Sequence, residues 1–269
     1  MSARLAAFPA ILITVAMIVA GAASAAAQPP VPPTKPDEGP GSDTQLGASF
    51  VGNTGNAQSA TLGADFSTNY RAAPWRFDAG ASAVRNSGRD VAVPVNRYLE
   101  NARIKRDVTE IAALTAGERL EHDPNAGIDL RSIIDAGLAW KLVRQPSWTV
   151  DAVTALAWNH EHPIQELEAI APTTNDAIAL LQGLSKIPIG ATGNTTQRVT
   201  WYPDFTRSDG SRVEAEVTAQ AAMNSRIAVK VGYLIRYVRV PLPGRENTDT
   251  TATASIVLTW KNPPAPPKP

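Results

Sequence analysis

Three stretches near the end of the chain decide its fold: RVEAEVTAQA at 212–221, IAVKVGYLIR at 227–236 and TATASIVLTW at 251–260. In each stretch, apolar residues occupy every second position almost without exception. A period of two indicates a β-strand with one apolar face and one wet face. Strands in soluble domains are usually about five or six residues long, whereas a tilted strand needs roughly 9–11 residues to cross a bilayer. The stretches therefore predict a transmembrane β-barrel.

The composition of the chain excludes several classes of function. Its 269 residues include 25 basic and 25 acidic side chains and no cysteine. A zero charge balance gives no reason to expect a nucleic-acid partner. The absence of cysteine excludes disulfides, thiolate catalysis, iron–sulfur clusters and a lipid-modified N-terminal cysteine.

The N-terminus carries the pattern of an export signal. Arg4 precedes a long apolar run, and the small-residue tract 21–27 offers a cleavage site after Ala25 or Ala27. A retained membrane helix is the alternative, because the stretch is long enough to span a bilayer. The alanine-rich end favours cleavage, so we expect residues 1–27 to be removed.

The segments 28–43 and 262–269 are rich in proline and lack apolar periodicity. This composition predicts disordered or polyproline-like spacers, with partner binding as the less favoured alternative. We expect both segments on the periplasmic side, flanking a barrel over 44–261.

Alternation predicts twelve strands that follow one another as an antiparallel up-and-down barrel, an all-β fold. Short turns alternate with generally longer loops, as in an outer-membrane barrel; the short connection 54–57, on the long-loop side, is the exception. Segment 177–189 also fits a short helix with a tail, which would leave ten strands. The predicted strands span 44–53, 58–70, 75–86, 96–107, 110–121, 128–143, 148–159, 177–189, 195–202, 211–222, 226–240 and 250–261.

Turn lengths also predict the register of three hairpins, because antiparallel neighbours must bring their apolar faces together. We take the loops as 71–74, 144–147 and 223–225. The predicted cross-strand pairs are Phe66–Ala79, Leu62–Ala83, Leu142–Trp148, Trp140–Val150, Ala221–Ile227, Val217–Val231 and Val213–Ile235.

Under this topology the tryptophans form two outward-facing girdles, where amphipathic rings lie at the headgroup level. A soluble sandwich would instead scatter them through its core. The predicted short-turn girdle contains Trp75, Trp140, Trp148 and Trp260, and the long-loop girdle contains Trp158 and Trp201.

Charged residues predicted to face inward are the main functional clue. Both signs occur in nearly equal number, and Lys141 with Asp151 and Lys230 with Glu216 fall diagonally across predicted hairpins. Such a lumen is either a narrow wet channel with little charge selectivity or a plug of ion pairs that fills a small barrel. The predicted lumen-lining residues are Arg76, Asp78, Asp129, Arg131, Asp135, Lys141, Asp151, Arg198, Arg212, Glu214, Glu216, Lys230 and Arg236.

Motifs for metal binding and catalysis are weak. His160-Glu161-His162, with Glu166 and Glu168 behind it, has metal-ligand chemistry, but it falls in a predicted polar loop. All the histidines fall in predicted loops, and no serine has a recognisable nucleophile setting. We therefore expect no metal ion, no cofactor and no enzymatic activity.

Several segments carry a family resemblance: LGASFVGNTGN at 46–56 with ATLGAD at 60–65, GIDLR at 127–131, YPD at 202–204, and VKVGYLIRYVRVP at 229–241 leading to TDT at 248–250. They resemble the salt-induced outer-membrane proteins, a Gram-negative family of unknown function. The resemblance covers about residues 44–261. It implies an outer-membrane β-barrel and no catalytic residues.

The same resemblance implies how the barrel is assembled. Family members end on an aromatic residue that helps the barrel-assembly machinery recognise the last strand, and here nine residues follow the similar signal. We expect a monomer inserted among outer-membrane lipid and lipopolysaccharide. The signal-like residues are Thr253, Ser255, Leu258 and Trp260.

Taken together, the patterns predict an outer-membrane barrel with one of two roles. It is either a minor passive pore for small solutes or ions, or a non-conducting structural component of the envelope-stress response. An outer-membrane enzyme, a metal-binding receptor and a soluble periplasmic β-protein are less favoured alternatives.

Overall fold

The computed structural model describes most of the chain from residue 40 to residue 262. The predicted signal, most of both proline-rich ends and the first connection lie outside the described residues. The described ranges are 40–54, 59–86, 95–165, 171–207 and 210–262.

The described chain is almost entirely β-strand. A single helical turn, η1 (Pro124–Ala126), lies in the described part, and no described helix is long and apolar enough to cross a membrane. The strands are β1 (Gly41–Thr54), β2 (Ser59–Ala72), β3 (Trp75–Asn86), β4 (Val95–Asp107), β5 (Ala112–Asp123), β6 (Ile128–Gln145), β7 (Trp148–Pro163), β8 (Thr174–Ile189), β9 (Gly193–Tyr202), β10 (Arg212–Ala222), β11 (Ile227–Val238) and β12 (Thr248–Asn262).

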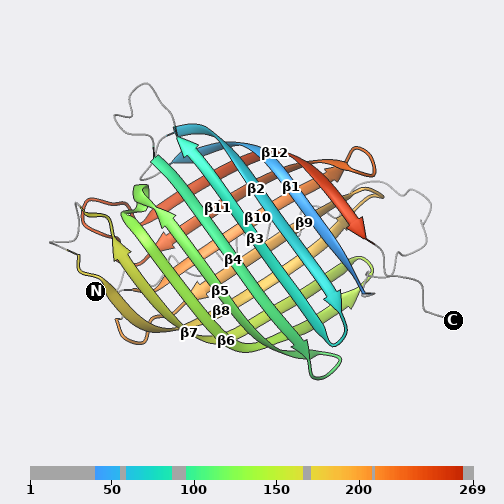
Figure 1. Ribbon diagram of the computed structural model, residues 1–269, viewed down its shortest axis with the longest axis horizontal. Coiled ribbons are helices and arrows are strands. Elements are labelled where there is room, and N and C mark those ends of the chain that lie inside the picture. The colour runs from blue at the N-terminus through green and yellow to red at the C-terminus, as the bar shows by residue number, and fades with distance from the viewer. Residues whose placement is uncertain (1–39, 55–58, 87–94, 166–170, 208–209, 263–269) are drawn as a thin grey trace, which may run out of the picture. The chain divides into compact units, whose positions relative to one another are not determined.

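These strands form one closed antiparallel barrel in which each strand pairs with its neighbours in the sequence (Figure 1). β12 returns to pair with β1, from Ser42 opposite Asn262 to Thr54 opposite Thr250. The predicted twelve-strand up-and-down barrel is therefore confirmed. The ten-strand alternative is wrong, because 177–189 lies within β8.

The predicted register of the β2–β3 hairpin is wrong by two residues. Phe66 lies opposite Ala81 rather than Ala79. The turn consists of Ala73 and Pro74 alone, because β2 continues to Ala72, two residues further than predicted, while β3 begins at Trp75 as predicted. A shift of two leaves the same side chains outward, because the side-chain period of a strand is two.

The register of the β10–β11 hairpin also differs from the prediction by two residues, in the same direction. Ala221 lies opposite Val229 rather than Ile227. The side-chain oxygen of Asn224 accepts hydrogen bonds from the backbone N–H groups of Arg226 and Ile227, both at 2.9 Å. This local capping widens the turn, a role that asparagine often takes in turns.

In the β6–β7 hairpin, Trp140 lies opposite Ala152 rather than Val150. A β-bulge between Lys141 and Val143 adds one residue to β6, and the turn is shorter than predicted. The other predicted pairs shift as well: Leu62 faces Arg85, Trp148 faces Gln145, Val217 faces Tyr233 and Val213 faces Tyr237.

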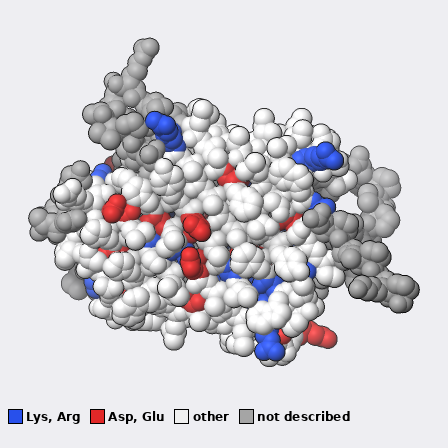
Figure 2. Space-filling view, in the orientation of Figure 1, with Lys and Arg blue, Asp and Glu red and all other residues white. Residues whose placement is uncertain are grey.

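The outward face of the barrel is largely apolar. Leu62, Leu156 and Ile256 point outward and are 75%, 72% and 62% exposed. Figure 2 shows a face made mostly of uncharged side chains, with a group of acidic side chains near its middle. The structure places the outward tryptophans close to the ends of their strands: Trp75, Trp140, Trp148 and Trp260 toward the short turns, and Trp158 and Trp201 toward the long loops.

Introducing an arginine on each face of one strand tests this assignment. Val217 points outward between Tyr233 and Gln197, so V217R places a charge on the lipid face, at a cost of about 2–4 kcal/mol near mid-bilayer. T218R, one residue along and facing Gly232 inside the lumen, should change stability little. Urea unfolding in lipid vesicles measures the free energy of unfolding of both variants. Equal losses of stability would contradict the assigned faces.

Candidate functional site

The barrel lumen is the candidate functional site, because the alternation that turns apolar side chains outward turns the charged ones inward. Val51 and Val257, 1% and 0% exposed, lie on this inward face. The structure places there every residue predicted to line the lumen except Asp129: Arg76, Asp78, Arg131, Asp135, Lys141, Asp151, Arg198, Arg212, Glu214, Glu216, Lys230 and Arg236.

Two sets of ion pairs join opposite walls of the barrel. Arg119 on β5 donates from both Nη atoms to the carboxylate oxygens of Glu214 on β10, at 2.8 and 2.9 Å. Arg236 on β11 lies 3.1 Å from Glu121 and 3.2 Å from Asp123, both on β5. In the closed order of twelve strands, β10 and β11 lie across the barrel from β5. These side chains therefore meet across the lumen.

Neighbouring strands extend these contacts into a continuous network. Arg131 on β6 lies 3.2 Å from Glu121 and 2.7 Å from Glu161 on β7. Arg97 on β4 lies 3.3 Å from Asp123. The side chain of Glu121 is only 2% exposed, so its charge is held by arginines rather than by bulk water.

Tyr202 and Arg212 complete the network on the β9–β10 side. The guanidinium of Arg212 lies over the Tyr202 ring, 4.3 Å from its centroid, an arrangement that gives a cation–π attraction. The Tyr202 hydroxyl accepts a hydrogen bond from Arg119 at 3.3 Å. We call the whole set the cross-lumen cluster: Arg97, Arg119, Glu121, Asp123, Arg131, Glu161, Tyr202, Arg212, Glu214 and Arg236.

The cross-lumen cluster lies toward the long-loop end, where β5 ends at Asp123. The connection between β9 and β10 reaches the same end, and Arg207 donates to both carboxylate oxygens of Asp176 at 2.9 and 2.5 Å. These hydrogen bonds raise the pKa of the Arg207 guanidinium above its ordinary value. Arg207 therefore stays charged and ties its loop to the barrel wall.

One wall of the lumen is apolar. Ile133, Val153, Ile178 and Leu180 come from β6, β7 and β8, point inward and are at most 6% exposed. They pack together with Tyr202 of the cross-lumen cluster. Apolar side chains thus cover one side of the lumen, and ion pairs cross the remainder.

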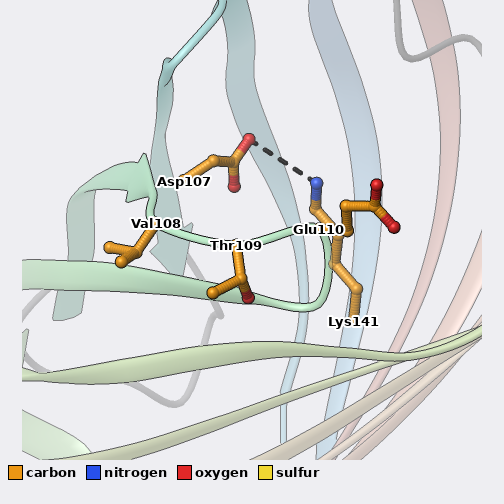
Figure 3. Close-up of a pocket in the computed structure, with 5 residues that line it drawn as sticks. All are labelled: Asp107, Val108, Thr109, Glu110 and Lys141. Atoms are coloured by element: carbon orange, nitrogen blue, oxygen red, sulfur yellow. Dashed lines mark ion pairs between the residues drawn. The ribbon is translucent and has the colours of Figure 1, made fainter.

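At the short-turn end, Lys141 lies directly opposite Asp151 rather than diagonal to it, because of the bulge in β6. Its ammonium points toward Asp107 at 3.5 Å, with the Glu110 carboxylate beside it (Figure 3). Asp107 also pairs with Arg76 at 2.5 Å. A pocket of about 670 Å³ opens here, lined by Asp107, Val108, Thr109, Glu110 and Lys141.

The predicted diagonal pair of Lys230 with Glu216 is wrong. The two-residue shift of the β10–β11 register places Lys230 opposite Gln220, and its ammonium lies 3.1 Å from Asp65 on β2. Glu216 pairs instead with Arg198 at 3.0 Å. Other pairs between inward-facing residues join strands no more than two positions apart in the barrel: Arg71–Asp43, Arg103–Asp135, Lys105–Asp78 and Arg144–Asp151.

Asp129 does not line the lumen, contrary to prediction. The β6–β7 register shifts between Ile128 and Leu130, and this irregularity turns Asp129 outward. Its side chain is 52% exposed and lies 3.5 Å from the ring of His122. An added residue re-aims its neighbours in this way, and alternation alone gives no sign of it.

The metal-like motif noted in the sequence is split between two faces. β7 is longer than predicted, so His160 and His162 lie on the strand and share its outward face. Glu161 between them points inward to Arg131, because adjacent strand residues alternate. Glu166 and Glu168 lie outside the described residues. Within the part that the structure describes, no group of histidines and carboxylates is arranged to hold a metal ion.

Several members of the cross-lumen cluster are absent from the residues predicted for the lumen. For three of them, the alternation along the strand already indicates an inward side chain. Arg97 precedes the outward Tyr98, and Arg119 and Glu121 flank the outward Leu120. Asp123 and Glu161 were missed because β5 and β7 extend beyond their predicted ends. The missed charged members are Arg97, Arg119, Glu121, Asp123 and Glu161.

Two carboxylates lie on the outward face between apolar neighbours. Glu100 lies opposite Leu120, and Glu118 lies opposite Ile134. Both side chains are exposed, and neither forms an ion pair with a described residue. They belong to the strands β4 and β5, and their place in the outward-facing rows puts them among lipid-facing residues.

The closed barrel with apolar outside and charged inside defines the chain as an outer-membrane β-barrel. The family model of proteins of unknown function designated DUF481 matches residues 46–260, so the chain belongs to this family. The resemblance to an outer-membrane β-barrel family of unknown function is thus confirmed.

A solved porin structure shares the fold, and two others show lower similarity. A structure of the NanC porin has a TM-score of 0.54 at 10% identity, covering 79% of this chain and 98% of that chain. The KdgM porin in complex with disordered oligogalacturonate has a TM-score of 0.45 at 9% identity, covering 80% and 99%. An anion-selective porin from Comamonas acidovorans has a TM-score of 0.40 at 8% identity, covering 82% and 98%. No curated protein matches the chain.

Removing the central carboxylate of the cross-lumen cluster tests its burial. E121Q leaves Arg131 and Arg236 short of a counter-charge, and breaking a buried pair in this way costs about 3–5 kcal/mol. The control E216Q removes a carboxylate whose partner Arg198 is 48% exposed, so about 0–1 kcal/mol is expected. Chemical unfolding in the same lipid vesicles compares the two. Equal losses would show that the cluster is solvated.

Replacing a lipid-facing carboxylate with an apolar residue should increase the stability of the barrel rather than decrease it. E118L should raise the free energy of unfolding by about 1 kcal/mol, because an acidic side chain on the lipid face is destabilising, though less than Lys or Arg. The control E110L changes an exposed turn residue outside the strands and should leave stability in lipid vesicles unchanged. A loss of stability in E118L would show that Glu118 does not face lipid.

Proposed function

We propose that this protein is a minor passive pore for small ions and solutes, narrowed by the cross-lumen cluster. The observation that carries the proposal is the pair of wall-to-wall contacts, Arg119 with Glu214 and Arg236 with Glu121. A permeating solute has to pass beside these contacts, which favours small ions over large molecules. Charges of both signs lie along the path and give no strong single-sign field, so little charge selectivity is expected.

The rest of the lumen supports a wet path up to this constriction. Arg198 and Glu216 are 48% and 34% exposed although they face inward, and the short-turn end holds an open pocket. These side chains are wetted, in contrast to Glu121 in the cross-lumen cluster. The narrow part of the proposed pore is therefore confined to the long-loop half.

A non-conducting structural barrel is the second candidate. It is favoured by the apolar wall, where Ile133 and Ile178 are each 2% exposed, because a small barrel can be filled by its own side chains. In this case the cross-lumen cluster acts as a plug. The experiment below separates the two candidates.

We also propose the route by which the barrel reaches its membrane. The chain is exported with cleavage of residues 1–27 and inserts into a Gram-negative outer membrane as a monomer, among lipid and lipopolysaccharide. The barrel-assembly machinery would read the last strand, β12. The residues proposed for this signal are Thr253, Ser255, Leu258 and Trp260.

Truncating one wall-to-wall contact tests the pore. The double variant R119A/E214A removes one charge of each sign, so net charge is unchanged while the lumen is cleared of a bridge. If the cluster is the constriction, conductance in planar bilayers should rise by at least about twofold, because the narrowest part limits ion flow.

The double variant R198A/E216A is the matched control. It also removes one pair, but that pair joins neighbouring strands β9 and β10 on a single wall, so conductance should change little. Absence of steady current from the wild type and from R119A/E214A would refute the pore and support the structural barrel. Equal increases in both double variants would refute the assignment of the constriction.

A further inference from the structure

Arg212 differs from the other arginines of the cross-lumen cluster. It is 6% exposed, and within the described part of the chain no carboxylate lies within ion-pair distance of it. Its contacts are the Tyr202 ring and the side-chain oxygen of Asn159, which lies 3.4 Å from Nη2. Arg212 is therefore a buried guanidinium with no direct ion-pair partner among the described residues.

The carboxylates of the cluster are already used by other arginines. Glu214 accepts hydrogen bonds from both Nη atoms of Arg119, and Glu161 accepts one from Nε of Arg131 at 2.7 Å. Glu121 and Asp123 are bonded to the remaining arginines. Within the cross-lumen cluster, five arginines thus accompany four carboxylates. Burying a charge without a partner is costly, so an anion beside Arg212 would stabilise the barrel.

The surroundings of Arg212 define the chemistry of that anion. A planar guanidinium binds carboxylate or phosphate oxygens through two parallel hydrogen bonds, and stacking on the Tyr202 face leaves the edge of the group available. The Tyr202 hydroxyl accepts from Arg119 and retains a proton to donate. Asn159 supplies a further polar side chain, 2% exposed.

We propose that Arg212 and Tyr202 form a binding site for a small oxyanion, a carboxylate or a phosphate, in the lumen. The site lies within the cross-lumen cluster, so an anion that enters the lumen meets it at the narrowest part. Binding does not require that the barrel conducts. A barrel without current would leave this proposal standing, and the two can fail separately.

The experiment measures thermal unfolding of the full chain in detergent during titration with potassium phosphate or potassium acetate, against potassium chloride at matched ionic strength. The wild-type unfolding midpoint should rise and saturate with phosphate, acetate or both. R212Q should weaken the apparent affinity at least about tenfold, because the fork-shaped donor is lost. R212K keeps the charge without the fork and should fall between the two.

The control is R198Q, which changes a lumen arginine that has its own carboxylate partner; it should keep the wild-type response. In the absence of oxyanion, R212Q should unfold no lower than the wild type, because it removes an uncompensated buried charge. A clear fall in its midpoint would show that Arg212 is balanced within the fold and would overturn the proposal. An unsaturating wild-type response, or equal responses in R212Q and R198Q, would overturn it as well.

Discussion

Closure of the sheet is the constraint on which the rest of the structure depends. Hydrocarbon offers no hydrogen bonds, so every backbone N–H and C=O group in the membrane must bond within the protein. Pairing of β12 with β1 meets this requirement for the first and the last strand. Closure also divides the side chains between lipid and lumen. Charged residues such as Glu121 and Arg131 lie in the lumen because a charged side chain on the lipid-facing side is destabilising.

The small size of the barrel then brings these charges together. Arg119 and Glu214 start from strands on opposite walls, yet their charged groups are 2.8 Å apart. In a wider barrel the same residues would line a water-filled channel. The contacts of the cross-lumen cluster are therefore a consequence of strand number combined with side-chain length, and they form the constriction of the proposed pore.

The sequence reveals the faces of the strands but not their partners. Alternation in β10, β11 and β12 identifies the inward residues, and a register error of two leaves each of them inward. The same error gives the wrong ion-pair partner. Lys230, for example, pairs with Asp65 rather than with Glu216. Cross-lumen pairs are further still from sequence reasoning, because Arg236 and Asp123 are 113 positions apart and meet only once the barrel has closed. Asp129 depends on a strand irregularity, for which the sequence offers no signal.

The charges of the cross-lumen cluster are not needed simply to fill space. Ile133, Ile178 and Leu180 fill the lumen on the β6–β8 side, and packed apolar residues often replace buried ion pairs without loss of stability. An apolar constriction excludes water and ions by dewetting, whereas a charged one can be wetted. The chain thus places charge where a path for ions would need it.

The distribution of charge along that path points to a weak preference rather than a strong one. At the short-turn end, Arg76 and Lys141 balance Asp107 and Glu110, so entry into the proposed pore would favour neither sign. The cross-lumen cluster differs, because its Arg212 has no direct ion-pair partner among the described residues. In the proposed pore, this positive charge would attract small anions, while the flanking ion pairs would leave no field strong enough to exclude cations.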